Sequence, residues 1–260
     1  MIGTADFLSV GSGGIVGFAL GLLGGGGSIL AVPLLVYVVG VRSTHTAIGT
    51  SALAVAANAF ANLIAHSRAG NVKWPCAGVF AFSGIAGAAA GAQFGRMVDG
   101  KQLLFLFGLV MMAVAAAMFS PRASAGDPNV RINPAIAVRL IVSGLAVGLL
   151  SGFFGIGGGF LIVPAIMLGS GMATINAVGS SLVSVGTFGL TTAVSYAIAG
   201  QVDWRIAGLF VLGGIGGGLG GVALAKRLST RRAALTRVFA VVVAAVAAFI
   251  LWRSAPSFFA

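Results

Sequence analysis

Apolar segments long enough to cross a membrane follow one another along most of the chain. A membrane-spanning helix needs about 20 apolar residues at about 1.5 Å per residue. The hydrophilic stretch from Ser120 to Asn133 separates two groups of four such segments. We therefore predict an all-α polytopic membrane protein. The segments cover approximately residues 7–40, 47–66, 74–95, 102–119, 135–171, 177–199, 204–225 and 235–252.

The two groups of segments repeat one pattern. With a shift of 131 residues, GFALGLLGGGGSILAVP (Gly17–Pro33) aligns with GLLSGFFGIGGGFLIVP (Gly148–Pro164). With a shift of 130, AIGTS (Ala47–Ser51) aligns with AVGSS (Ala177–Ser181). Duplicated halves are common in transporters, which place the substrate site where the halves meet. We divide the chain into a first membrane repeat (1–119), a linker (120–134) and a second membrane repeat (135–260).

The first segment of each repeat is too long for a single crossing. Residues 7–40 as one helix would measure about 51 Å, against a hydrocarbon core of about 30 Å. Each of these segments also carries a glycine cluster near its middle, with a proline after it. We predict a broken element in each half, with two short helices meeting at Gly24–Ser28 and at Gly155–Gly159.

The distribution of basic residues bears on how the broken elements fold. If each long segment crosses once, the loop bases divide 8 to 7; if each returns to its starting side, they divide 10 to 5. The positive-inside rule favours the second arrangement, and the first stays the alternative. Each half then has a re-entrant helix pair plus three transmembrane helices, the halves are inverted repeats, and both termini lie outside. The ten bases on one side are Arg68, Lys73, Arg122, Arg131, Arg139, Lys226, Arg227, Arg231, Arg232 and Arg237.

Composition supports the membrane assignment. The 260 residues are 58% hydrophobic and 7% charged, with a mean hydropathy of +1.10. Soluble domains carry about a quarter of their residues as charged side chains. The net charge of +11 is interpreted as membrane topology and not as a nucleic-acid surface, because the bases lie singly or in small groups between apolar runs. No basic region precedes the first apolar stretch, so we expect no removed signal peptide.

Enzyme patterns are weak in this sequence. Gly216-x-Gly218-x-x-Gly221 matches a dinucleotide-binding fingerprint, but no strand is predicted before it and no acidic residue follows Asp203. Two histidines and one cysteine are too few for a zinc site, and no Gly-x-Ser-x-Gly elbow is present. We expect neither enzymatic activity nor a cofactor.

The glycine breaks are the strongest candidates for a substrate site. Irregular backbone at membrane depth persists only where it is buried in protein or lines a cavity. The N–H groups that open the helix after such a break carry partial positive charge and bind anions. The chain has no glutamate, and its aspartates lie at segment ends or in the linker, at positions 6, 99, 127 and 203. Carriers driven by protons or cations usually bury a carboxylate. This pattern favours an anionic substrate.

Polar side chains also fall at helical spacing within the spans. Such neutral groups either join neighbouring helices or line a path for a polar solute, and both interpretations stay open. One stripe consists of Asn58, Asn62 and His66; the other of Ser180, Ser184, Thr187, Thr191 and Ser195.

The doubled motif resembles the TauE/SafE group, the sulfite exporter or toluenesulfonate-uptake permeases. GFALGLLGGGGSILAVPLL and GLLSGFFGIGGGFLIVPAI carry the resemblance, together with AIGTS, AVGSS and the later NVKWPCAG and QVDWRIAG. It covers nearly the whole chain. It implies transport of small sulfur-containing or organic anions, such as sulfite, sulfonates or sulfoacetate, across the bacterial cytoplasmic (inner) membrane. The two repeats differ at two groups of aligned positions. Ser28 aligns with Gly159 and Gly25 with Ile156, whereas Asn58, Asn62 and His66 align with Phe188, Thr192 and Tyr196.

The sequence thus predicts a multi-pass transporter of a small anion, working by alternating access around the two breaks. A non-transporting anchoring or assembly subunit and a passive anion channel are the alternatives. The sequence does not indicate the anion, the direction of transport, the coupling ion or the oligomeric state. The expected substrate-binding residues are Gly24, Gly26, Gly27, Ser28, Thr50, Ser51 and Asn58 in the first half, and Gly155, Gly157, Gly158, Gly159, Ser180 and Ser181 in the second.

Overall fold

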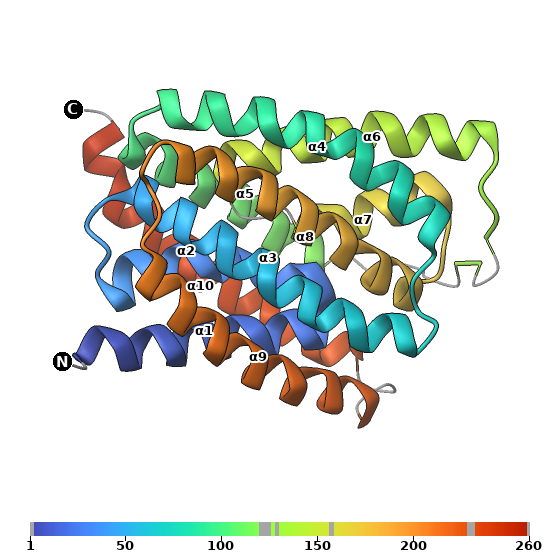
Figure 1. Cartoon of the computed structure of the whole chain (residues 1–260), viewed down its shortest axis with the longest axis horizontal. Helices are drawn as coiled ribbons and strands as arrows, with labels where there is room; N and C mark the ends of the chain where they lie inside the picture. Colours follow the sequence, from blue (N-terminus) through green and yellow to red (C-terminus); the bar gives the residue numbers. More distant parts are fainter. Residues whose placement is uncertain (1–2, 120–125, 128–129, 156–158, 228–231, 259–260) are drawn as a thin grey trace.

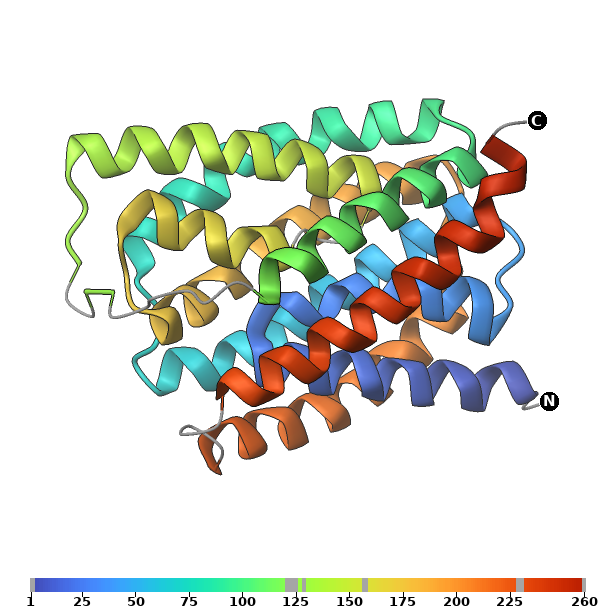
Figure 2. The ribbon, with the colours of Figure 1, turned by 180° about the vertical axis from the view of Figure 1, so that it is seen from behind.

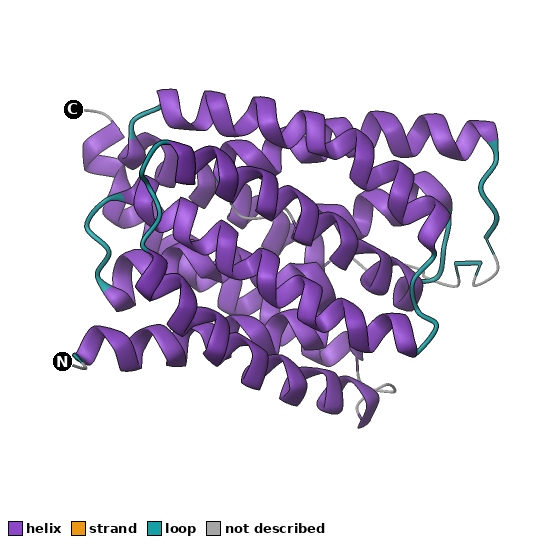
Figure 3. Ribbon diagram, in the orientation of Figure 1, coloured by secondary structure: helices purple, strands orange, loops and turns teal. Residues whose placement is uncertain are grey.

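The computed structural model describes residues 3–119, 126–127, 130–155, 159–227 and 232–258. These residues form helices and no strand (Figure 3). Within them, seven helices are long and apolar enough to cross a membrane, and the helices lie alongside one another in one bundle (Figures 1 and 2). The prediction of an all-α polytopic membrane protein is confirmed.

The helices follow the predicted segments in both halves. The first half contains α1 (Thr4–Leu23), the 3-10 helix η1 (Gly24–Leu30), α2 (Ala31–Pro33), the π-helix η2 (Leu34–Val39), α3 (Thr44–Arg68), α4 (Trp74–Met97) and α5 (Gly100–Phe119). The second half contains α6 (Pro134–Phe154), α7 (Gly159–Ser170), α8 (Thr174–Ile198), α9 (Trp204–Arg227) and α10 (Arg232–Phe258).

The first segment of each half is broken at its glycine cluster, as predicted. In the first half, regular α-helix stops at Leu23 and the chain continues as 3-10 helix through the glycines. In the second half, α6 stops at Phe154 and α7 begins at Gly159. Two shorter helical pieces therefore replace one helix that would be too long for the bilayer.

Each broken segment returns to the end of the bundle from which it started. We call the end where α1, α3 and α9 begin the first end, and the end where α4, α6 and α8 begin the second end (Figure 1). At the first end, the ion pair between Asp6 and Arg205 joins the starts of α1 and α9 at 2.7 Å. At the second end, Asp127 of the linker exchanges backbone hydrogen bonds with Gly171 and Ala173, beside the start of α8. The last described residues of α10 lie at the first end, as α1 does (Figure 2).

Packing occurs mainly between the halves. Helix α1 lies along α9 and α6 lies along α4, while α3 packs against α8 and α5 against α10. Glycines bring the paired backbones together: a Cβ atom on Gly17 would overlap Gly214, and one on Gly148 would overlap Gly84. These are equivalent positions of the repeat. Close approach through small residues is the usual basis of helix packing in membranes.

We predict that Gly87→Ala destabilises the protein and that Gly78→Ala on the same helix does not. A Cβ on Gly87 would overlap the Leu145 carbonyl of α6, whereas Gly78 has open space around it. Overpacking of this kind costs about 1–3 kcal/mol, and an unobstructed surface change stays within about 0.5 kcal/mol. Thermal unfolding of the detergent-purified variants measures the difference. Equal melting temperatures would contradict this account of α4–α6 packing.

Candidate substrate site at the helix breaks

The two breaks lie next to each other in the interior of the bundle. The 3-10 helix η1 packs against α7, and it also contacts α8. Ser28 is fully buried, and Gly27 and Gly159 are buried too. Gly24 and Gly26 belong to η1, whereas Gly157 and Gly158 fall outside the described residues. The structure thus brings together the described parts of two elements that are more than a hundred residues apart in sequence.

Glycine is required at both breaks, for different reasons. Gly155 ends α6 with a φ of +66°, and a Cβ there would also overlap the side chain of Ile48 on α3. Left-handed backbone of this kind is the common glycine stop of a helix. Gly27 lies directly against the backbone of α1 at Leu20, where a Cβ would overlap the chain. It therefore lets η1 fold back onto α1.

The AIGTS and AVGSS motifs join the two halves. Thr50 Oγ1 accepts a hydrogen bond of 2.9 Å from the Asp203 backbone N–H, and Ser180 Oγ accepts one of 2.9 Å from Lys73 N–H. Each bond links the second turn of a motif helix to the start of the Trp-containing helix in the other half. The preceding glycines make room for this contact, since a Cβ at Gly49 or Gly179 would overlap or crowd the backbone of residue 201 or 71.

The second hydroxyl of each motif bonds within its own helix. Ser51 Oγ donates to the Ile48 carbonyl at 2.9 Å, and Ser181 Oγ donates to the Val178 carbonyl at 2.8 Å. Thr50 and Ser180, by contrast, use only their oxygens in the bonds to Asp203 and Lys73, so each keeps a proton to donate. The four hydroxyls that the sequence assigns to substrate thus also have protein partners.

This junction between the halves was not predicted from the sequence, and its one unusual local feature, the start of α4, does not indicate it. The residue before α4 is Lys73, whose side chain makes no capping bond to the helix. Helices usually begin with Ser, Thr, Asp or Asn to satisfy their first N–H groups. Asp203, at the equivalent position, caps its own helix by accepting from Ile206 N–H, yet its backbone N–H makes the same contact, so a missing cap does not predict the junction.

Asn58 occupies the interface between α3 and α9. Its side chain is fully buried against Gly214, where a Cβ would overlap the amide. Both amide atoms of Asn58 are without a hydrogen-bond partner among the described residues, although Asn62 Nδ2 donates to the Asn58 carbonyl at 2.9 Å. The equivalent pair in the other half is Phe188 against Gly84. Burying an unpaired amide is costly. A polar ligand beside Asn58 would remove this cost, whereas Phe188, at the equivalent position, needs no polar partner.

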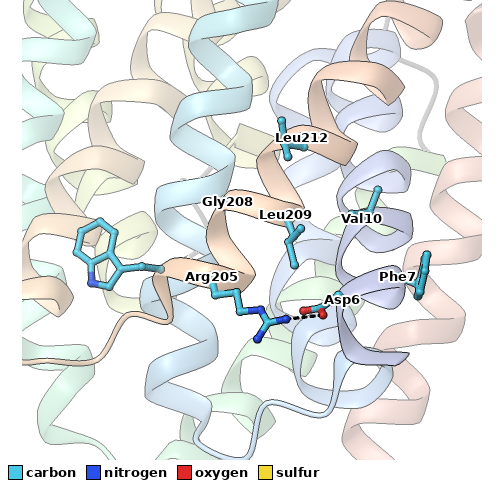
Figure 4. A pocket seen from close by; sticks show the side chains of 8 residues that line it. Asp6, Phe7, Val10, Arg205, Gly208, Leu209 and Leu212 are labelled. Carbon is cyan, nitrogen blue, oxygen red and sulfur yellow. Dashed lines mark hydrogen bonds and ion pairs between the residues drawn. The ribbon is translucent and has the colours of Figure 1, made fainter. Parts of the chain in front are cut away.

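The hollow at the outer face of the bundle has a different character. A groove of about 740 Å³ lies between the first turns of α1 and α9, lined mainly by apolar side chains (Figure 4). Phe7 is 72% exposed and Trp204 67% exposed there, beside the Asp6–Arg205 ion pair. A second groove, between α4 and α6, occupies the repeat-related place. These surfaces suit contact with lipid chains more than binding of a polar solute. Among the described residues, no group of three His, Cys, Asp or Glu side chains could hold a metal ion.

Comparison with protein-family models matches residues 9–250 to the family described as "Sulfite exporter TauE/SafE". The chain belongs to the TauE/SafE family. No solved structure matches it.

Curated relatives of this TauE/SafE chain carry transporter names. A "Probable membrane transporter protein" of Xylella fastidiosa (strain 9a5c) is 54% identical over 251 residues, covering 95% of each chain. The "Probable membrane transporter protein YunE" of Bacillus subtilis (strain 168) is 28% identical over 243 residues, covering 84% of this chain and 87% of its own. A Haemophilus influenzae protein with the same general name is 26% identical, covering 72% of each chain.

Family membership and the helical bundle together establish the class of protein. It is a membrane transporter and not an enzyme. It lies in the cell membrane as a multi-pass protein and acts on a small solute. The expectations of family, of class and of membrane location made from the sequence are confirmed.

We predict that Thr50→Val lowers stability and that Thr50→Ser does not. Valine keeps the shape of threonine but leaves the Asp203 N–H without its acceptor, whereas serine keeps the hydroxyl. An unpaired, partly buried donor costs about 1 kcal/mol. Thermal unfolding in detergent checks the prediction, with Ser180→Ala expected to behave like Thr50→Val. If valine and serine at position 50 gave the same melting temperature, the junction would contribute nothing to the fold.

Proposed function

We propose that this protein transports a small anion, with sulfite, sulfoacetate or a similar organosulfonate as the expected substrate. The observation that carries the proposal is the packing of η1 against α7. Two helix breaks thereby lie together in a bundle whose aspartates lie at helix ends or in the linker. The description of the family names sulfite, which agrees with a sulfur oxyanion.

The electrostatics of the breaks suit an anion. Helix α7 begins at the buried Gly159, and the first N–H groups of a helix have no partner within it. They carry partial positive charge, which favours an oxyanion and disfavours a cation. In our proposal the backbone N–H groups at Gly157–Gly159 hold the substrate together with those at Gly26–Ser28, which would exchange their bonds within η1 for bonds to the substrate.

The motif hydroxyls complete the coordination in this proposal. Gly155 contacts Ile48, one turn before Ser51 on α3, so the second break adjoins the AIGTS motif. Thr50 and Ser180 each have a proton free to donate to an oxyanion while their oxygens hold the junction. Asn58 would contribute its unpaired amide from the α3–α9 interface.

We further propose that the halves are inverted repeats that exchange conformations during transport. Helices α3 and α8 pack against each other and run in opposite directions (Figure 1). The α1–η2 segment returns to the first end and the α6–α7 segment to the second. Transporters of inverted repeats alternate access by moving one repeat against the other around a site at the interface.

We predict that sulfur oxyanions stabilise the purified protein and that Gly26→Val removes this effect. A ligand bound only by the folded state adds about 2.7 kcal/mol of stability at a hundred times its dissociation constant. The melting temperature would be measured with sulfite, sulfate, thiosulfate, sulfoacetate, taurine, acetate and chloride. Gly208→Val is the matched control, because Gly208 lies on α9 with open space around it.

Uptake into proteoliposomes completes this test. Saturable uptake of the stabilising anion that is lost in Gly26→Val, with ligand-free melting retained, would support the site. Unchanged uptake in Gly26→Val would contradict it, and uptake without saturation would indicate a channel. Stabilisation by no anion would contradict the anionic substrate.

A further inference from the structure

Arg96 lies at the first end of the bundle, and no described carboxylate pairs with it. Arg96, in the last turn of α4, is partly buried. Its Nη1 donates to the Ser195 carbonyl of α8 at 3.1 Å, and its Nη2 donates to Gln93. Its Nε is buried without a partner, and no described aspartate pairs with its charge. The two bonds use two of the five guanidinium N–H groups, and the buried Nε–H is among those that remain available.

Two consecutive residues of α8 at this contact, Ser195 and Tyr196, carry hydroxyls that have no hydrogen-bond partner among the described residues. Tyr196 of α8 is fully buried, yet its hydroxyl makes no hydrogen bond, and the hydroxyl of Ser195 is likewise buried and unpaired. The Tyr196 ring stacks on His45 of α3 with centroids 6.2 Å apart, and the Nδ1 of His45 is unpaired too. Phenylalanine would supply the same packing without burying a hydroxyl, so packing alone does not explain Tyr196.

This cluster adjoins the second break through consecutive residues of α3. A Cβ at Gly49 would lie 2.7 Å from the Tyr196 Cβ, so the tyrosine packs directly on that glycine. The preceding residue, Ile48, contacts Gly155 at the break. Tyr196 and the second break therefore contact consecutive residues of α3.

We propose that Arg96, Tyr196, Ser195 and His45 form an entry site for the transported oxyanion at the first end of the bundle. The arginine Nε–H and the two hydroxyls are donors, and an oxyanion offers only acceptors. The planar guanidinium also presents paired N–H donors that can bind two oxygens of one oxyanion. A cationic solute would be repelled. This inference rests on the proposed anionic substrate and specifies where that substrate first binds.

The repeat places a comparable pair at the second end. Position 96 aligns with Lys226 and position 196 with His66, near the ends of α9 and α3. The side chain of Lys226 falls outside the described residues. A basic residue at each end of the bundle would attract an anion from both sides of the membrane.

A purely structural role for Arg96 makes a different prediction. Its bond to the Ser195 carbonyl lies in the last turn of α8, where a cation offsets the negative end of the helix dipole. If that were its whole role, loss of the charge would lower the melting temperature without ligand and leave the affinity for substrate unchanged. An entry site predicts a raised KM for the anion with a nearly unchanged maximal rate.

The decisive experiment measures initial uptake of sulfite and sulfoacetate into proteoliposomes against concentration. We expect Arg96→Gln to raise KM about tenfold or more, as loss of a charged hydrogen-bonding partner does. We expect Tyr196→Phe, which keeps the ring, to raise KM about threefold or more. Arg205→Gln and Tyr37→Phe are the matched controls, removing a cation at the same end and the other tyrosine hydroxyl; both should keep the wild-type KM.

The possible outcomes distinguish a failure of the entry-site proposal from a failure of the proposed transport function. Saturable wild-type uptake with an unchanged KM in Arg96→Gln and Tyr196→Phe would overturn the entry site alone. A loss of maximal rate with an unchanged KM would overturn it as well. No saturable uptake of either anion by the wild type would overturn the proposed function and the entry site together. If Arg96→Gln failed to fold, Tyr196→Phe would decide.

Discussion

Backbone hydrogen bonding inside the membrane is the constraint on which this structure depends. In hydrocarbon, every N–H and carbonyl group needs a partner within the protein, so a break in a helix must be enclosed. Here the enclosure comes from the other half of the chain: η1 lies against α7 and α8, and Gly155 lies against α3. The glycine-lined contacts of α1 with α9 and of α6 with α4 bring the surrounding helices close enough to seal the breaks.

The features of the fold that were predicted from the sequence are those that depend on residues close together in the chain. Segment length and hydropathy predicted the helices, and the positions of the glycine clusters predicted the breaks. The roles of Thr50 and Ser180 could not be predicted in the same way. A hydroxyl in a helix has the same local sequence whether it faces a solute or the backbone of a distant helix. Arg96 entered the prediction only as one of the loop bases counted for membrane topology, because the residue that it contacts lies on α8, 99 positions away.

The two halves have equivalent helix contacts, but different side chains fill the equivalent spaces between the helices. Gly214 and Gly84 leave equivalent spaces, which Asn58 and Phe188 occupy. One space therefore holds an unpaired amide and the other holds an aromatic ring, which stacks on Phe80 at 6.1 Å between centroids. If the halves exchange conformations, the two end states bury different chemistry. Symmetry then does not make the two end states equal in free energy, and any difference sets which of them the protein occupies at rest.

The hydrogen bonds between the halves can form only late in synthesis, because their partners lie far apart in the chain. Thr50 and Asp203 are 153 residues apart, and Lys73 and Ser180 are 107 apart. At a translation rate of about 5–20 residues per second, Thr50 waits roughly 8–30 s for its partner. During that interval the first half lies in the bilayer with its glycine faces and its broken helix uncovered. The nascent chain is then the form of the protein most exposed to mispairing and to quality-control proteases.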